Sequence, residues 1–149
     1  MADKFLVKYA ASALPIEQLE ATDTSQSSRI VHSSIDKNLA GSGEADCGAT
    51  ASNVRYKDYT TTTSDVHLNT IMSATLTGID LVFVKIREAG STGTPDCTIT
   101  FGTQIVSKLT KVDDCVLIRP SALAGSSLKF KSSGATEVAK IDIMWGLES

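Results

Sequence analysis

The sequence predicts an all-β protein: an antiparallel β-sandwich, jelly-roll-like, with about eight strands and an extended N-terminal arm. From Thr77 to Trp145 one short apolar segment follows another, and turns of Gly, Ser, Pro and Asp separate them. Periodic blocks of helix-forming residues are scarce, whereas threonine, whose branched Cβ suits a pleated strand, is abundant. Short turns favour a sandwich over a parallel sheet, because parallel strands need long, usually helical connections.

The first 24 residues differ from the rest of the chain. We predict that residues 1–24 form an arm and that residues 25–149 form one β-sandwich domain. Phe5-Leu6-Val7 is a short apolar cluster between two lysines. Residues 14–20 have the pattern of one or two helical turns with Pro15 near the start, which is too short to be stable alone.

The segment between the arm and the strand-rich half contains fewer strand patterns. Residues 29–35 and 54–59 have the composition of strands, and residues 65–71 form a further candidate. Residues 40–51 are small and rich in glycine and alanine, so we expect a loop there.

The segment Ile79–Arg87 is apolar on both faces of the predicted strand. Ile79, Leu81 and Phe83 alternate on one face, and Val82, Val84 and Ile86 alternate on the other. Such a strand is usually covered on both sides, although a bulge that changes the inward face would give the same pattern. If one of these faces is exposed on the monomer, we expect it to belong to an interface.

The remaining strands alternate more simply. They are predicted at residues 97–101, 104–109, 115–118, 127–131 and 138–145, and Pro120 ends the third of them. Closing two sheets face to face should then bury the following core residues: Ile99, Phe101, Leu117, Leu128, Phe130, Ile141, Ile143 and Trp145.

Composition argues against two classes of partner. The chain has 149 residues and a net charge of −3, which does not suit a nucleic-acid binder that relies on bulk positive charge. The longest uncharged apolar run in the strand-rich half, Leu81–Val84, is too short to span a bilayer, and charges interrupt the first residues where a signal peptide would be apolar. We therefore predict neither nucleic-acid nor membrane binding.

No cysteine or histidine pattern indicates catalysis, a metal or a cofactor, so we predict no enzyme. Cys47, Cys97 and Cys115 lack the close spacing of a zinc site and suit free thiols in a reducing compartment. Asp65 and His67 share one face of the expected strand, as half of a metal site or a base with the carboxylate that orients it would; a structural or surface role is the alternative. The candidate calcium ligands are three loop carboxylates, with solvated turn residues as the alternative: Asp96, Asp113 and Asp114. The glycine-rich segment 41–48 lacks the Lys-Ser/Thr ending of a phosphate-binding loop.

Two groups of apolar residues are candidate binding surfaces. Tyr56, Tyr59 and Trp145 would suit a sugar platform, although core packing is the commoner role of such scattered aromatics. The arm either packs on its own sheet or adds to a neighbouring subunit's sheet edge. Its candidate partner-binding residues are Phe5, Leu6, Val7, Tyr9, Leu14, Ile16 and Leu19.

The closing segment carries a family resemblance. Cys115-Val116-Leu117-Ile118-Arg119-Pro120, a short Ala/Gly/Ser loop, Ser127–Gly134 and Val138–Gly146 resemble the jelly-roll decoration (cement) proteins of tailed-bacteriophage capsids and related small virion proteins. The resemblance covers about the last 70 residues, and residues 25–75 do not align.

The resemblance implies a structural virion protein. It implies a decoration protein on the capsid exterior, made in the host bacterial cytoplasm, that self-associates as a dimer or trimer and binds the major capsid protein. An N-terminal arm would help it to bridge neighbouring capsomers. The alternative is a glycan-binding fibre or lectin-like module of a phage tail.

Overall fold

The computed structural model describes residues 3–13, 16–18, 29–31 and 39–148. The chain divides into two compact units: residues 1–7 with 45–149, here called the body, and residues 8–44. The boundary predicted at residue 24 falls inside the second unit.

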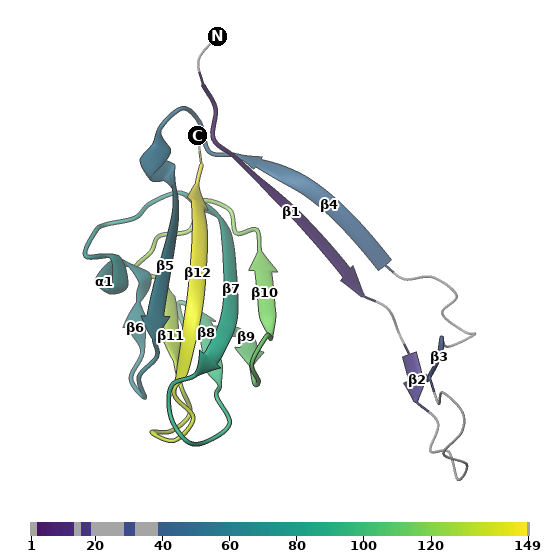
Figure 1. Cartoon of the computed structure of the whole chain (residues 1–149). Helices are drawn as coiled ribbons and strands as arrows, with labels where there is room; N and C mark the ends of the chain where they lie inside the picture. The colour runs from purple at the N-terminus through teal and green to yellow at the C-terminus, as the bar shows by residue number, and fades with distance from the viewer. Residues whose placement is uncertain (1–2, 14–15, 19–28, 32–38, 149) are drawn as a thin grey trace. The chain divides into compact units, whose positions relative to one another are not determined.

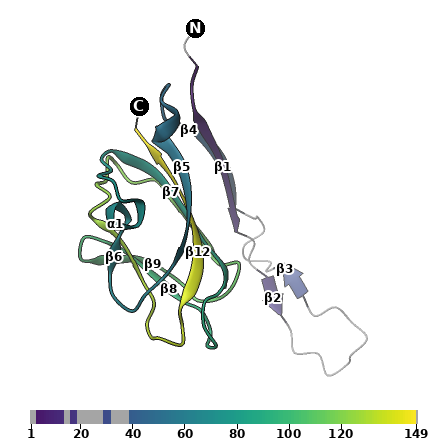
Figure 2. The same ribbon diagram turned by 60° about the vertical axis from the view of Figure 1, so that its left-hand side comes forward.

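The body is built from two four-stranded antiparallel sheets, so the predicted all-β class is confirmed (Figures 1 and 2). One sheet has the order β10-β7-β12-β5, and here it is called the outer-row sheet. Its strands are β5 (Val54–Thr60), β7 (Ile79–Ala89), β10 (Cys115–Ile118) and β12 (Ala139–Leu147). The second sheet has the order β6-β11-β8-β9. Its strands are β6 (Val66–His67), β8 (Cys97–Phe101), β9 (Gln104–Leu109) and β11 (Leu128–Lys131).

The strands of the body pair in a nested order. β8 pairs with β9, β7 with β10, β6 with β11, and β5 with β12. The innermost pair is a hairpin whose turn is Gly102-Thr103, and Gly102 has a φ of 60°, which a glycine adopts without strain. Two further ladders, β7 with β12 and β8 with β11, join these pairs into the two sheets.

The two sheets share one apolar core. Alternation along the strands sends every second side chain inward, as Ile141, Ile143 and Trp145 in β12 illustrate. Seven of the eight predicted core residues are buried or pack against this core. Leu117 is the exception, because its register partner is Phe83, which faces outward, whereas Val116 pairs with the core residue Val84.

A bulge explains the doubly apolar pattern of β7. The register slips between Gly146 and Leu147 of β12, so that Leu147 pairs with Ile79 and Gly146 with Leu81. The slip turns Ile79 into the core with Val82, while Leu81 faces outward. The two explanations offered for the pattern, a strand covered on both sides and a bulge that changes the inward face, therefore each apply to part of β7.

Three predictions about local structure are wrong. Residues 40–51 were expected to be a loop, but β4 spans Leu39–Asp46 and a 3₁₀ turn spans Ala51–Asn53. The helical turns expected within residues 14–20 are replaced by β2 (Ile16–Gln18), which pairs with β3 (Arg29–Val31). The strand expected at residues 65–71 stops at His67, where α1 (Leu68–Met72) begins, and Leu68 is a core residue.

Buried polar contacts close one end of the body. The Asp96 carboxylate is 7% exposed and accepts hydrogen bonds from the Ser133 backbone N–H at 2.8 Å and from its hydroxyl at 2.5 Å. The Thr61 hydroxyl accepts a hydrogen bond from the Ala139 N–H at 2.9 Å and contacts the Ser132 hydroxyl. These side chains satisfy backbone groups that the ladders leave unpaired at the strand ends.

Candidate interaction surface

The predicted arm is divided between the two units, because residues 1–7 belong to the body and residues 8–24 belong to the second unit. β1 spans Leu6–Ala13 and pairs with β4, and Figure 1 shows the two strands running in opposite directions. Phe5, Leu6 and Val7 lie in the body, where the Phe5 N–H donates to the Gly48 carbonyl at 2.8 Å and the Phe5 carbonyl accepts from the Cys47 N–H at 2.9 Å. This part of the arm therefore contacts the chain's own body.

Residues 5–7 and 45–48, here called the ribbon base, pack on the outward face of the outer-row sheet. An ideal Cβ placed on Gly146 would lie 2.7 Å from Cys47 Sγ, 3.8 Å from Leu81 Cβ and 3.9 Å from Val7 Cγ2. The missing side chain of Gly146 therefore makes room for the Cys47 thiol. Leu81 and Cys47 are fully buried, and burial raises the pKa of the Cys47 thiol.

An exposed ion pair joins Lys4, which precedes the ribbon base, to Asp46 within it. Lys4 Nζ is 2.7 Å from the Asp46 carboxylate. The hydrogen bond to Lys4 lowers the pKa of Asp46, and the same bond raises the pKa of Lys4. Because both groups are open to solvent, this pair orients the segment more than it stabilises it.

The other arm candidates lie in the second unit or outside the described residues. Tyr9 covers Gly43, where a side chain would collide with the tyrosine ring. Ile16 lies in β2 opposite Val31, and the structure does not describe its side chain. Leu14 and Leu19 lie outside the described residues.

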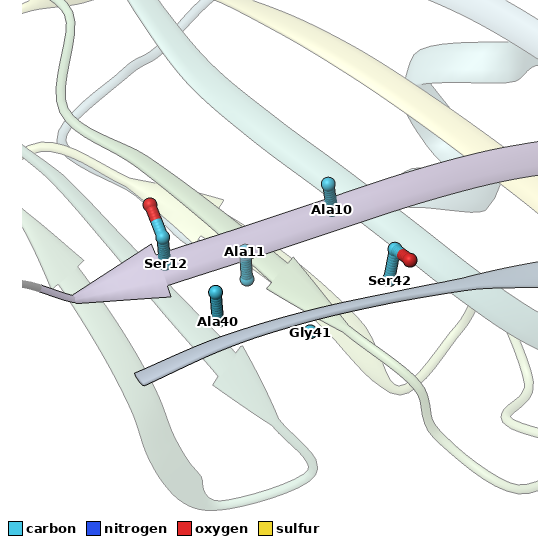
Figure 3. Close-up of a pocket in the computed structure, with 6 residues that line it drawn as sticks. All are labelled: Ala10, Ala11, Ser12, Ala40, Gly41 and Ser42. Carbon is cyan, nitrogen blue, oxygen red and sulfur yellow. The ribbon is translucent and has the colours of Figure 1, made fainter. Parts of the chain in front are cut away.

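Residues 8–13 and 39–44, here called the ribbon, form a two-stranded sheet, and its side chains are short at residues 10–13 and 40–43. Figure 3 shows six of these short side chains along β1 and β4. They surround a shallow, open hollow of about 420 Å³. The hollow is lined by Ala10, Ala11, Ser12, Ala40, Gly41 and Ser42. Residues 9–13 and 39–43 carry no charge, so this part of the ribbon lacks the lysines and prolines that usually protect sheet edges.

A row of large side chains crosses the outward face of the outer-row sheet, one from each strand. The ladder registers place them side by side, with Leu117 opposite Phe83, Phe83 opposite Met144, and Met144 opposite Tyr56. Tyr56 is 55% exposed and Met144 is 36% exposed, while Phe83 and Leu117 are half-buried. We call these four residues the apolar row.

Charged side chains border the apolar row on one side. Lys85, Asp142 and Asp58 occupy the next outward positions of β7, β12 and β5. The Tyr56 hydroxyl donates to Asp142 at 2.9 Å, and this hydrogen bond raises the pKa of Tyr56. Arg87 also contacts Asp142, at 3.5 Å. The row is thus a defined apolar strip rather than part of a wholly apolar face.

The aromatic residues considered for a sugar platform do not form one surface. Trp145 is 1% exposed and belongs to the core, and Tyr59 is partly buried against that core. Tyr56 is the member of the trio that is exposed on the apolar row.

The carboxylates considered for metal binding have other partners. Asp96 bonds Ser133, the Asp114 carboxylate accepts the Thr110 N–H at 2.8 Å, and Asp113 lies 2.9 Å from Lys85. Asp65 lies 3.8 Å from Lys131. Among the residues that the structure describes, no group of three or more His, Cys, Asp or Glu side chains could hold a metal ion.

Comparison of the chain with protein-family models, curated proteins and solved structures gave no match. Within the described ranges, no helix is long and apolar enough to cross a membrane. Neither the ribbon nor the apolar row was predicted from the sequence. The ribbon has no apolar alternation, and the row becomes visible only once the strand registers are known.

Proposed function

We propose that this chain is a structural virion protein, a capsid decoration protein that binds the assembled phage head. The observation that carries the proposal is the ribbon. A two-stranded sheet is at best marginally stable in water, and three or more strands or packing on another element are needed for stability. A ribbon whose residues 9–13 and 39–43 carry no charge is therefore suited to pairing with or packing on another protein.

The strand order of the body supports the same proposal. Numbering β5 to β12 from one to eight gives the sheet orders 1-8-3-6 and 2-7-4-5. We propose that this nested order is that of a jelly roll, an architecture that many viral capsid domains adopt. Such a body is a rigid platform from which a ribbon can contact a neighbouring subunit.

The proposed partners are further copies of this chain and the major capsid protein, on the capsid exterior. Many copies bound to one shell would stabilise it by mass action, because the protein binds the assembled form. Assembly in the bacterial cytoplasm would suit the three free cysteines, two of which are buried.

Co-sedimentation with capsids tests the proposal. The full chain should sediment with expanded capsids assembled from the major capsid protein of the phage that encodes it. Gly41→Glu should weaken binding at least tenfold, because it places a charge in the ribbon where a side chain has room. Ser126→Glu, an equally small exposed residue in a body loop, is the matched control and should bind normally.

A point substitution is a sharper test than deleting residues 1–20, because the deletion would also remove Val7 and expose Leu81. Absence of binding by the unaltered chain would contradict the decoration role. Equal binding by Gly41→Glu would exclude the ribbon as the capsid contact.

A further inference from the structure

The apolar row consists of large side chains, and the hollow of the ribbon is lined by small ones. We propose that the ribbon of a second copy of this chain docks on the apolar row. This inference rests on the self-association part of the proposed function and names the surface through which it occurs.

The first argument is the match of large side chains to small ones. Neighbouring strands lie about 4.8 Å apart, so the four residues of the row form a ridge roughly 14 Å wide. Ala11, Ala40 and Gly41 line the shallow hollow of the ribbon, where short side chains leave room for large ones. Tyr56 and Met144 are exposed large apolar side chains, whose burial is favourable.

The second argument is continuity with packing that the body already has. Val7 and Cys47 of the ribbon base cover Leu81 and Gly146, which are one outward row away from Phe83 and Met144. Alternate residues of a strand are about 6.7 Å apart, so the covered row and the apolar row are neighbours. The outer-row sheet thus already accepts a segment of the β1–β4 pair beside the proposed docking position.

The third argument concerns which molecule supplies the ribbon. Both surfaces occur on this chain. An exchange of ribbons between two copies therefore covers the apolar row and the ribbon of each copy together. The match in charge is also consistent, because residues 9–13 and 39–43 are uncharged, as is the row, while charged side chains lie beyond the row at Lys85 and Asp142. Residues 9–13 and 39–43 of an identical chain therefore bring no unpaired charge onto the row.

A cross-linking experiment between two kinds of full chain tests the inference. Both carry Cys115→Ser, because Cys115 is exposed whereas the other two cysteines are buried. One kind adds Met144→Cys on the row, and the other adds Gly41→Cys on the ribbon. Under mild oxidation the mixture should give a disulfide-linked pair of unlike chains, and neither kind alone should give a linked pair.

Sedimentation without capsids provides the second measurement. The unaltered chain should have the mass of two or more copies, and Met144→Glu should reduce it to that of one. Ile105→Glu is the matched control, since Ile105 is 69% exposed on β9, the edge strand of the other sheet. It should keep the unaltered mass. The fluorescence of buried Trp145 verifies that each variant is folded.

Several results would overturn the inference. One is an unaltered chain that sediments as a monomer. Another is a chain carrying both new cysteines that links them internally, while the mixture gives no linked pair, because the chain's own ribbon would then occupy the row. A third is loss of association in Ile105→Glu but not in Met144→Glu. A monomer that still binds capsids would contradict this inference and leave the proposed function in place.

Discussion

Replacing Gly146 by alanine should strain the contact between the outer-row sheet and the ribbon base. The new Cβ would lie 2.7 Å from Cys47 Sγ, closer than the two atoms can approach. Cys47 is fully buried, so its thiol has little room to move. Overpacking of this kind costs about 1–3 kcal/mol of the free energy of unfolding.

A double-mutant cycle gives the test its specificity. Cys47→Ala alone removes one buried heavy atom and should cost about 1 kcal/mol. In the double variant the new Cβ occupies space that the sulfur has vacated. The combined loss should therefore be smaller than the sum of the two single losses by at least about 0.5 kcal/mol.

Urea denaturation followed by the fluorescence of Trp145, the chain's single tryptophan, measures these changes. Gly41→Ala is the matched control, because nothing lies within 4 Å of a Cβ at that position, and it should change stability by less than about 0.5 kcal/mol. Strictly additive losses, or a neutral Gly146→Ala variant, would refute the proposed packing of Cys47 against the sheet.

Three further predictions concern the body. Burial raises the pKa of Cys97 from 9.0 to about 12. The thiol's contribution to stability is therefore fully present below pH 9 and is lost as the pH rises towards 12. Denaturation curves recorded between pH 8 and pH 11 should show a smaller loss of stability with rising pH in Cys97→Ala than in the unaltered chain. Phe130→Ala removes a fully buried ring and should lower the free energy of unfolding by about 3–5 kcal/mol. If Phe101→Ala lowered the free energy of unfolding more than Phe130→Ala does, the assignment of Phe130 to the centre of the core would be wrong. Asp96→Ala leaves the Ser133 N–H unpaired and should cost about 1–3 kcal/mol, whereas an unchanged urea midpoint would show that Ser133 finds another partner.

Alternation made much of the body predictable. Cys97–Phe101 and Ala139–Ile143 alternate between inward apolar and outward polar side chains, and β8 and β12 lie close to the predicted bounds. The outward direction of Leu117 could not be predicted, because all four residues of Cys115–Ile118 are apolar and only the register with β7 decides their direction. A shift of one residue would have placed Leu117 in the core.

The candidate surface was harder to predict for a related reason. Leu39–Asp46 contains glycine, serine and alanine, which are typical of loops, and backbone pairing with β1 makes it a strand. Phe5, Leu6 and Val7 were recognised as an apolar group, but their attachment depends on Gly146, which is about 140 residues away in the sequence. Contacts at such separations have no local signal.

The nested pairing of the body also determines when the body can fold. Only β8 and β9 are joined by a tight turn, and each further pair encloses a longer loop, until β5 meets β12. Such high contact order slows folding. β12 lies between β5 and β7, which do not pair with each other. The outer-row sheet therefore cannot form until Ala139–Leu147 have left the ribosome. β12 therefore completes the outer-row sheet, and formation of the apolar row waits for the synthesis of this strand.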